Sequence, residues 1–417
     1  MDKYLKKLLK TLCFLTATTA VAAFAFAFYV GNLLPDTFLV AKDGTLCVAG
    51  MPFLKMEMDR KDTRVSAPEG EESSYNVRLS IGGVIPVKTA RAISVQRRVV
   101  TVCGTPFGIK MFANGAMIVA FSDIYTADGY QNPAKTAGLR MGDVVMSIAG
   151  KPTKTNEDVV AALQKVGGAP AELVYMRDGK EKRVKLTAVK DAATDSWRTG
   201  MWVRDSSAGI GTLSFVDNAK GVFAGLGHSI HDSDTGETIP FRKGEIVDVE
   251  ITGSEAGAPG KPGELKGRFL SPAATGDIAV NDETGVYGEI YGYQRGLDME
   301  VALSQEIVPG PAEIYTTIEG RTPTRYTVEI EKIDIASTES NRNMVVHITD
   351  PRLLNSTGGI VQGMSGSPIL QNGHFIGAVT HVLVNDPTRG YGIFAETMLA
   401  SADKVAQKGT MERHQAA

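Results

Sequence analysis

The stretch GMSGSPILQNGHFIGAVTH, residues 363–381, frames a serine with glycines and then continues into two short apolar segments. Glycine permits positive φ angles and a close approach of the backbone to a ligand, so Ser365 can present its hydroxyl on a tight turn. The backbone amides of Gly363 and Ser365 can point into the same space and hold an oxyanion. The residues Gln371, Asn372 and Gly373 between the apolar segments favour a β-hairpin. The stretch therefore predicts a reactive serine at the entrance to a hairpin.

The composition describes an ordinary folded protein with many turns. The 417 residues leave room for two or three domains, and 43% hydrophobic with 22% charged residues can form normal cores. A net charge of -3, without a cluster of Lys and Arg, argues against a nucleic-acid partner. The 45 glycines indicate many turns and favour a mainly β architecture.

The amino terminus predicts a membrane-spanning helix. Residues 11–35 contain no charged side chain and can cross a hydrocarbon core of roughly 30 Å as a helix. Four lysines precede this segment and Asp36 follows it, which predicts a cytoplasmic amino end and an exported remainder. A cleaved signal peptide is the alternative, since Ala25-Phe26-Ala27 offers a cleavage site. The apolar run continues past that site. We therefore interpret residues 1–35 as a cytoplasmic amino terminus followed by an uncleaved transmembrane anchor.

Residues 36–103 are interpreted as a linker or propeptide followed by a short β segment. Within them, residues 57–76 are polar and charged, as expected of an exposed linker where proteolytic nicking concentrates. Residues 77–103 carry β-branched runs that predict short strands. Cys47 and Cys103 would both lie in an exported compartment and could pair, although the sequence does not establish a disulfide.

Residues 104–190 form a compact module with mixed elements. The run AGLRMGDVVMSIAGKP, residues 137–152, contains a strand and a turn. Thr155 and Asp158 then fit a helix capping box, and Asp178-Gly179 turns a hairpin. The module resembles a PDZ domain of the type carried by bacterial exported proteases.

PDZ domains bind peptide ends by strand addition and capture the terminal carboxylate with backbone amides. The resemblance implies that Phe107, Gly108 and Ile109 form this carboxylate loop, with the helix that begins near Glu157 as the other wall of the groove. The alternative is that Phe107 and Ile109 are simply core residues.

Residues 191–417 contain the candidate catalytic residues. A serine nucleophile needs a base close to its hydroxyl. His228 stands at the end of an apolar strand in GLGHSIHD, where its side chain can enter a cleft. His231 lies three residues further on, but no third His or Cys ligand occurs at a useful spacing, so we expect no metal site and no cofactor.

The order of His228 before Ser365 resembles the trypsin-like architecture of two six-stranded β-barrels. The segments GLGHSIHDSDTG, VHITDPRLL and GGIVQGMSGSPILQNGHFIGAVTHVLVNDPTRGYGIF, together with the PDZ pattern, resemble the stage IV sporulation protein B family of membrane-anchored serine peptidases. This resemblance implies that Ser365 is the nucleophile, His228 the general base and Asp350 the acid of the triad. The amides of Gly363 and Ser365 would stabilise the oxyanion.

Two roles remain open. In trypsin-like enzymes the acid usually follows the histidine more closely, and Asp277 fits that general spacing better than Asp350 does. Thr380 and His381 follow the strand FIGAV, a segment that borders the pocket for the residue preceding the cut bond in trypsin-like folds. His381 either belongs to this specificity pocket or packs as a structural group.

The family resemblance also implies a biological role. The enzyme would process itself and cleave a membrane-bound regulator of an intramembrane metalloprotease, in the space between the membranes around a developing spore. A late sigma factor would be activated as a result. The alternative from another class is a catalytically silent membrane scaffold whose PDZ domain gathers partners.

Overall fold

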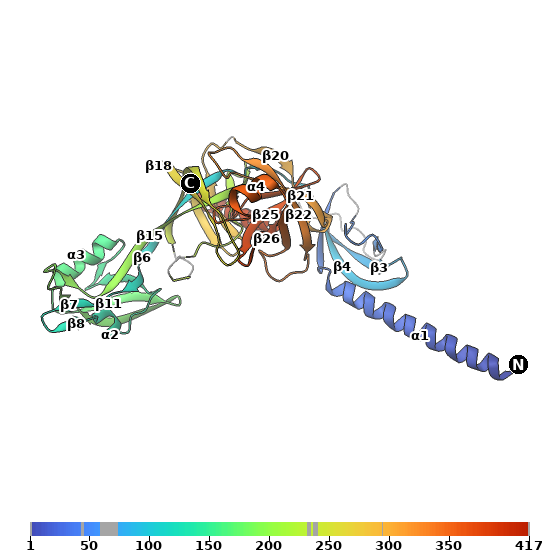
Figure 1. Cartoon of the computed structure of the whole chain (residues 1–417), viewed down its shortest axis with the longest axis horizontal. Coiled ribbons are helices and arrows are strands. Elements are labelled where there is room, and N and C mark those ends of the chain that lie inside the picture. Colours follow the sequence, from blue (N-terminus) through green and yellow to red (C-terminus); the bar gives the residue numbers. More distant parts are fainter. Residues whose placement is uncertain are drawn as a thin grey trace.

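The structure is a computed structural model that describes residues 2–42, 46–58, 74–231, 235–236, 241–293 and 295–415. Figure 1 shows a chain of separate bodies, with the amino-terminal helix and a small sheet at one end, a double β-barrel in the middle and a PDZ module at the other end. The architecture is mainly β, as the sequence predicts.

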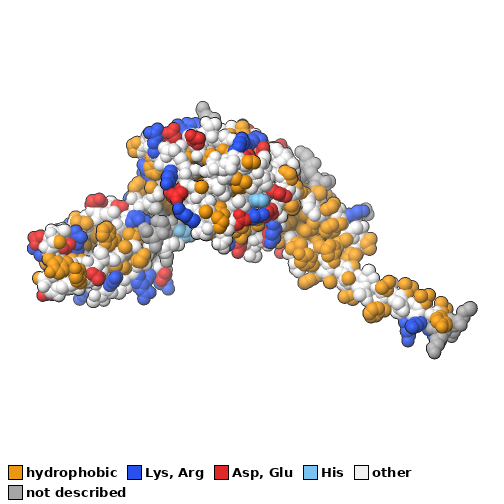
Figure 2. Space-filling model, in the orientation of Figure 1, with side chains coloured by type: hydrophobic (Ala, Val, Ile, Leu, Met, Phe, Trp, Pro, Cys, Tyr) orange, Lys and Arg blue, Asp and Glu red, His pale blue; other side chains and the backbone are white. Residues whose placement is uncertain are grey.

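Helix α1 (Asp2–Asn32) contains the predicted apolar segment. The part from Tyr4 to Asn32 is long and apolar enough to cross a membrane, and nearly all of it is exposed. Its carboxyl end packs on the small sheet, where Ala27 and Val30 are buried. Figure 2 shows hydrophobic side chains along this helix and over the adjoining sheet. The helix is compatible with either a single-pass anchor or a signal sequence.

The small sheet is built from residues that the sequence places between anchor and PDZ module. Its strand order is β1-β4-β3-β2, with parallel pairing of β1 to β4 and antiparallel pairing elsewhere: β1 (Thr37–Ala41), β2 (Leu54–Met58), β3 (Ser74–Ile81) and β4 (Ile85–Val95). The predicted linker 57–76 falls largely outside the described residues. Cys47 is exposed, Cys103 is buried in the first barrel, and the two are not paired.

The first barrel closes through six antiparallel strands in the order β6-β17-β18-β19-β16-β15, with β15 pairing back to β6. These strands are β6 (Pro106–Phe121), β15 (Met201–Asp217), β16 (Val222–Gly225), β17 (Phe241–Glu255), β18 (Glu264–Asp282) and β19 (Gly285–Ile290). Strands β5 (Val99–Val102) and β20 (Leu297–Glu300) extend the sheet beside β15. Its core contains Phe107, Met111, Leu213 and Phe223.

The PDZ module is inserted into the first barrel between β6 and β15. Both strands leave the barrel and continue as a paired ribbon into the module. The remaining elements are β7 (Ile124–Thr126), β8 (Gly129–Gln131), α2 (Pro133–Thr136), β9 (Val144–Ile148), β10 (Lys151–Pro152), α3 (Asn156–Val166), β11 (Pro170–Arg177), β12 (Lys180–Thr187), β13 (Val189–Lys190) and β14 (Trp197–Arg198). The predicted capping box of Thr155 and Asp158 is present at the start of α3, and Asp178-Gly179 turns the hairpin of β11 and β12.

The insertion places the beginning of the predicted PDZ segment 104–190 in the first barrel and corrects one site assignment. Residues 107–112 of β6 lie between β15 on one side and β17 on the other, inside the first barrel. Phe107 and Ile109 are buried in that barrel, and a side chain at Gly108 would meet Phe269 and Val247. The assignment of Phe107, Gly108 and Ile109 to a PDZ carboxylate loop is therefore wrong, because a strand paired on both edges has no edge to offer a peptide.

The second barrel is closed by β21 (Gly310–Thr316), β22 (Thr324–Ile333), β23 (Met344–Ile348), β26 (Asp386–Phe394), β25 (His374–Leu383) and β24 (Pro368–Gln371), in that order. The predicted hairpin through Asn372 and Gly373 joins β24 to β25. Two helices complete the domain: α4 (Pro351–Thr357) precedes the serine loop, and α5 (Ala395–Gln415) packs against β16 and β25. A short 3-10 turn, η1 (Ser304–Glu306), links the barrels. Two six-stranded barrels in succession confirm the trypsin-like fold expected from the sequence.

Candidate active site

Ser365 lies in a tight loop between α4 and β24, where the second barrel meets the first. Gly363 and Gly366 both have positive φ angles, 95° and 93°. A Cβ atom at Gly366 would lie 2.0 Å from the carbonyl oxygen of Thr212 and 2.5 Å from the amide nitrogen of Leu226. Glycine is required at 366 both for the backbone conformation and for this close approach of the two barrels.

Strand β15 of the first barrel donates three hydrogen bonds to carbonyl groups of the serine loop. The Thr212 hydroxyl donates to the Gly363 carbonyl at 2.8 Å, and the Thr212 amide donates to the Ser365 carbonyl at 3.0 Å. The Ser214 hydroxyl donates to the Gly366 carbonyl at 2.7 Å. Thr212 and Ser214 are almost completely buried, so these hydrogen bonds are shielded from water.

The amides assigned to the oxyanion hole are available. Within the described part of the chain, the Gly363 and Ser365 amides have no backbone acceptor, whereas the Gly366 amide donates to the Val379 carbonyl. Two free amides on one tight turn are suited to bind the negative oxygen that forms during acyl transfer.

His228 follows β16 directly, in the first barrel. The two preceding residues, Leu226 and Gly227, both have positive φ angles, 67° and 71°. This conformation is uncommon for leucine, and such backbone strain clusters at functional sites. The Nδ1 atom of His228 lies 2.8 Å from the carbonyl oxygen of Ser229. A carbonyl oxygen only accepts, so Nδ1 carries the proton and Nε2 is left free to act as a base.

The two loops converge on Thr380 and His381 of β25. The Ser365 hydroxyl donates to the Thr380 carbonyl at 2.8 Å, and the ring centroids of His228 and His381 lie 4.9 Å apart. Ser365 and His228 thus occupy one site, but each is hydrogen-bonded to a carbonyl rather than to the other. The serine hydroxyl must turn away from Thr380 before His228 can accept its proton.

The predicted pocket residues differ in their exposure. The Thr380 side chain is buried, its hydroxyl donates to the Asn341 carbonyl at 2.9 Å, and its methyl group lies against Gly227 beside His228. His381 is partly buried, and its Nδ1 atom has no hydrogen-bond partner. Burial and the neighbouring imidazole of His228 lower the pKa of His381 to about 4, so His381 is neutral near pH 7.

Neither candidate acid is hydrogen-bonded to His228. Asp350 caps α4, and its carboxylate accepts from the Arg352 guanidinium at 2.7 Å and from the Thr327 amide at 3.2 Å. The hydrogen bonds from Arg352 lower the pKa of Asp350 to about 2. Asp277 accepts a hydrogen bond from the hydroxyl of Tyr291. The triad role of Asp350 therefore stays a prediction.

The Asp350→Asn variant is expected to lose far more turnover than Asp277→Asn. The loss should come from a less stable start of α4 and not from a missing catalytic group. Asp350 anchors the helix that leads into the serine loop, and removing its charge weakens the bonds from Arg352 and Thr327. Thermal unfolding and initial cleavage rates of both variants measure this ranking. A larger loss of turnover in Asp277→Asn would transfer the role of the acid to Asp277.

The acid side of the pH–activity profile is expected to have its midpoint below the ordinary histidine pKa of about 6.5. Burial lowers the pKa of His228, and the nearby His231 lowers it further. His381 also lies against the ring. A general base acts only when neutral, so a lowered pKa keeps His228 active as the pH falls below 6.5. Initial rates of cleavage over the acid range test this, and a midpoint above 6.5 would indicate a carboxylate partner that stabilises the imidazolium.

A groove of about 470 Å³ begins beside the oxyanion amides. Its walls come from β15, from β18 and from the serine loop, and it is lined by Ala208, Gly209, Ile210, Glu264, Leu265, Gly267, Phe269, Gln362 and Gly363. Leu265 contacts Gly363 directly. The groove combines apolar side chains of Ile210, Leu265 and Phe269 with polar groups that include Glu264 and Gln362.

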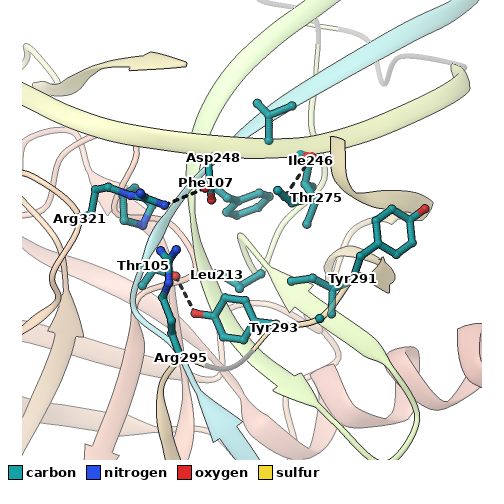
Figure 3. Close-up of a pocket in the computed structure, with 14 residues that line it drawn as sticks. Thr105, Phe107, Leu213, Ile246, Asp248, Thr275, Tyr291, Tyr293, Arg295 and Arg321 are labelled. Carbon is teal, nitrogen blue, oxygen red and sulfur yellow. Dashed lines mark hydrogen bonds and ion pairs between the residues drawn. The ribbon is translucent and has the colours of Figure 1, made fainter. Parts of the chain in front are cut away.

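A second cavity of about 320 Å³ opens at one end of the first barrel and contains Phe107. Figure 3 shows the Phe107 ring among side chains of the barrel strands, with the ion pair of Arg321 and Asp248 beside it. The hydroxyls of Tyr293 and Thr105 lie 3.0 Å apart. This view also places Phe107 in the barrel rather than in a peptide groove of the PDZ module.

Comparison with known proteins supports the same division. Residues 195–399 match the family model described as SpoIVB peptidase S55, and residues 128–188 match a PDZ domain model. The segment 195–399 is thus assigned to the SpoIVB peptidase family. The chain is a serine peptidase with a PDZ domain, as the sequence predicts.

Two further proteins are similar over parts of the chain. A probable periplasmic serine endoprotease, DegP-like, from Pseudomonas fluorescens is 33% identical over 125 residues, which make up 28% of this chain and 24% of that protein. The chain thus spans about a quarter of the length of this relative. Among solved structures, the PDZ domain of an SdrC-like protein from Listeria monocytogenes is 16% identical and covers 22% of this chain and 90% of that chain, with a TM-score of 0.18.

The sequence did not reveal the residues that support the site from β15. Thr212 and Ser214 lie in GIGTLSFVD, which predicts only a strand. Their signal is the presence of hydroxyl side chains in an otherwise apolar, buried strand, because buried polar groups need hydrogen-bond partners.

Proposed function

We propose that this SpoIVB-family peptidase is anchored by its amino-terminal helix, with its bulk exported into the intermembrane space of the developing spore. There it cuts its own chain and a membrane-bound regulator of an intramembrane metalloprotease, and so signals activation of a late sigma factor. The observation that carries the catalytic part is the convergence of the Ser365 loop and the His228 loop on Thr380 and His381, at the junction of the two barrels.

In the proposed reaction, the Ser365 oxygen attacks the carbonyl carbon of the scissile bond. His228 takes the serine proton at Nε2 and returns it to the leaving amine, while the amides of Gly363 and Ser365 bind the oxyanion. Water then cleaves the acyl-enzyme with His228 again as base. The resting bond from Ser365 to the Thr380 carbonyl supports a substrate-linked step. A substrate amide that donates to this carbonyl would release the serine hydroxyl toward His228.

The substrate is proposed to be an extended protein segment. The groove beside Gly363 offers an apolar surface made by Ile210, Leu265 and Phe269. His381 lies next to His228 and is the proposed polar element of the specificity pocket. A groove that offers both apolar side chains and polar groups suits an extended chain that binds through backbone and apolar contacts.

Self-processing tests the proposal on the full chain. Expressed in a host with an export route, the wild type is expected to lose its anchor by cuts between about residues 52 and 75, because this stretch largely overlaps the polar and charged segment 57–76 that the sequence predicts as an exposed linker. The Ser365→Ala variant should remain full length. Amino-terminal sequencing of the fragments locates the cuts, and identical fragments from both proteins would assign them to another protease.

A further inference from the structure

Asn281 holds the peptide group that orients His228. Asn281 lies near the end of β18, two strands from the end of β16, because Asn281 pairs with Val286 of β19 and Val286 pairs with Gly225. The Asn281 Oδ1 atom accepts from the Ile230 amide at 2.7 Å, and its Nδ2 atom donates to the Ile230 carbonyl at 3.1 Å. Both hydrogen-bonding functions of the side chain are therefore used on one residue of the histidine loop.

The two hydrogen bonds from Asn281 to Ile230 also affect the Ser229 carbonyl, because a trans peptide group is planar. The Ile230 amide and the Ser229 carbonyl belong to the same planar peptide group, and they point in opposite directions. By fixing the amide of this group, Asn281 also fixes the direction of the carbonyl that accepts from Nδ1 of His228. The relay runs from Asn281, through the peptide group, to the imidazole.

This relay occupies the position where a triad acid would act. A group that accepts from Nδ1 keeps the proton on that nitrogen and leaves Nε2 free to take the serine proton. In this structure the acceptor is the Ser229 carbonyl, whereas the carboxylates of Asp350 and Asp277 are bound elsewhere.

We infer that Asn281 is a positioning residue that orients His228 through the peptide group between Ser229 and Ile230. The inference deepens the proposed function, on which it rests, by naming the residue that fixes the acceptor of the His228 Nδ1 proton. Among the described residues, His231 and His381 are the titratable groups that face the imidazole, and neither is required as an acceptor.

The test uses the full chain in detergent and measures the rate at which a fluorophosphonate labels Ser365, with casein cleavage as a second readout. Asn281→Leu is expected to slow both by about 10- to 100-fold, because small displacements of a catalytic group carry costs of this order. The acid midpoint of the labelling profile should also move to lower pH, since a misdirected carbonyl no longer stabilises the imidazolium. Asn281→Asp should recover part of the rate, because a carboxylate oxygen still accepts from the Ile230 amide but no longer donates to the Ile230 carbonyl.

Asn343→Leu is the matched control. Asn343 also holds the backbone at two points, by donating to the Glu339 carbonyl and accepting from the Phe394 amide, but in the second barrel. The Asn343→Leu variant should have a lower melting temperature but the same acid midpoint of the labelling profile as the wild type. If Asn281→Leu does not fold, Asn281→Ala removes the same bonds without added bulk. Wild-type rates and an unchanged midpoint in a folded Asn281 variant would overturn the inference, whereas a wild type unlabelled at Ser365 would overturn the proposed function instead.

Discussion

The His228→Ala variant is expected to lose at least about a thousandfold in peptide-bond cleavage, because it removes the proposed general base. His228 already has Nε2 free and its ring beside the segment that binds the serine hydroxyl. The fold should survive, since the side chain is only partly buried and makes one hydrogen bond, to the adjacent carbonyl. Initial rates on a protein substrate, together with the melting temperature, separate lost chemistry from lost structure.

His231→Ala is the matched control for this variant. His231 lies three residues further along the same loop and interacts with the Ser229 hydroxyl at 3.3 Å. It should retain most of the activity. Substantial cleavage by purified His228→Ala, or an equal loss in His231→Ala, would remove His228 from the role of general base.

The second large effect is expected from adding one methyl group at Gly366. The Cβ atom of Gly366→Ala would be placed 2.0 Å from the Thr212 carbonyl oxygen, and alanine would also have to adopt a φ of 93°. The backbone strain alone costs about 1–3 kcal/mol. The loop must shift to relieve the clash, which displaces both the serine hydroxyl and the oxyanion amides, so turnover should fall by about 100-fold or more.

Gly253→Ala provides the comparison for this loss. Gly253 lies in β17, has no positive φ angle, and a Cβ atom there would meet nothing within 4 Å. This variant should match the wild type in turnover and in melting temperature. Full activity of Gly366→Ala would mean that the serine loop tolerates a shift away from β15, and the proposed hold of Thr212 on the loop would not matter for catalysis.

Local patterns were sufficient to predict most of the protease fold. The hairpin after Ser365, the capping box at Thr155 and the turn at Asp178-Gly179 each depend on a few neighbouring residues, and each is present. The long apolar segment at the amino terminus likewise specifies a helix by its length and composition. Such features depend on neighbouring residues in the chain, so they can be predicted without knowing which distant segments pack against them.

The misplacement of Phe107, Gly108 and Ile109 has a non-local cause. PFGIKM predicts a strand, and it is one, but the sequence does not reveal which sheet receives it. Strand β6 runs from the first barrel into the PDZ module, and its first half pairs with β17, more than 100 residues later in the chain. A strand pattern records alternation along one chain, whereas sheet membership is decided by the pairing partner.

The role of Asn281 beside the His228 loop could not be predicted from the sequence, because it depends on pairing between distant strands. A search for a triad acid considers only aspartate and glutamate, and it therefore passes over Asn281 in AVNDETG. The chain brings Asn281 to the histidine loop only after β18, β19 and β16 align side by side. The triad role of Asp350 is implied by the family resemblance and stays a prediction, and in this structure its carboxylate begins α4 and binds Arg352.

The catalytic role of Ser365 is tested most directly by mapping the site of fluorophosphonate labelling on the full-length protein by mass spectrometry of its peptides. We expect a single adduct on the Ser365 oxygen, formed by the wild type, lost in Ser365→Ala and strongly slowed in His228→Ala. Labelling of Ser365 that proceeds at the wild-type rate in His228→Ala would contradict the assignment of the base. No labelling of the folded wild type at Ser365 would contradict the central claim and would favour a membrane scaffold built on the PDZ domain.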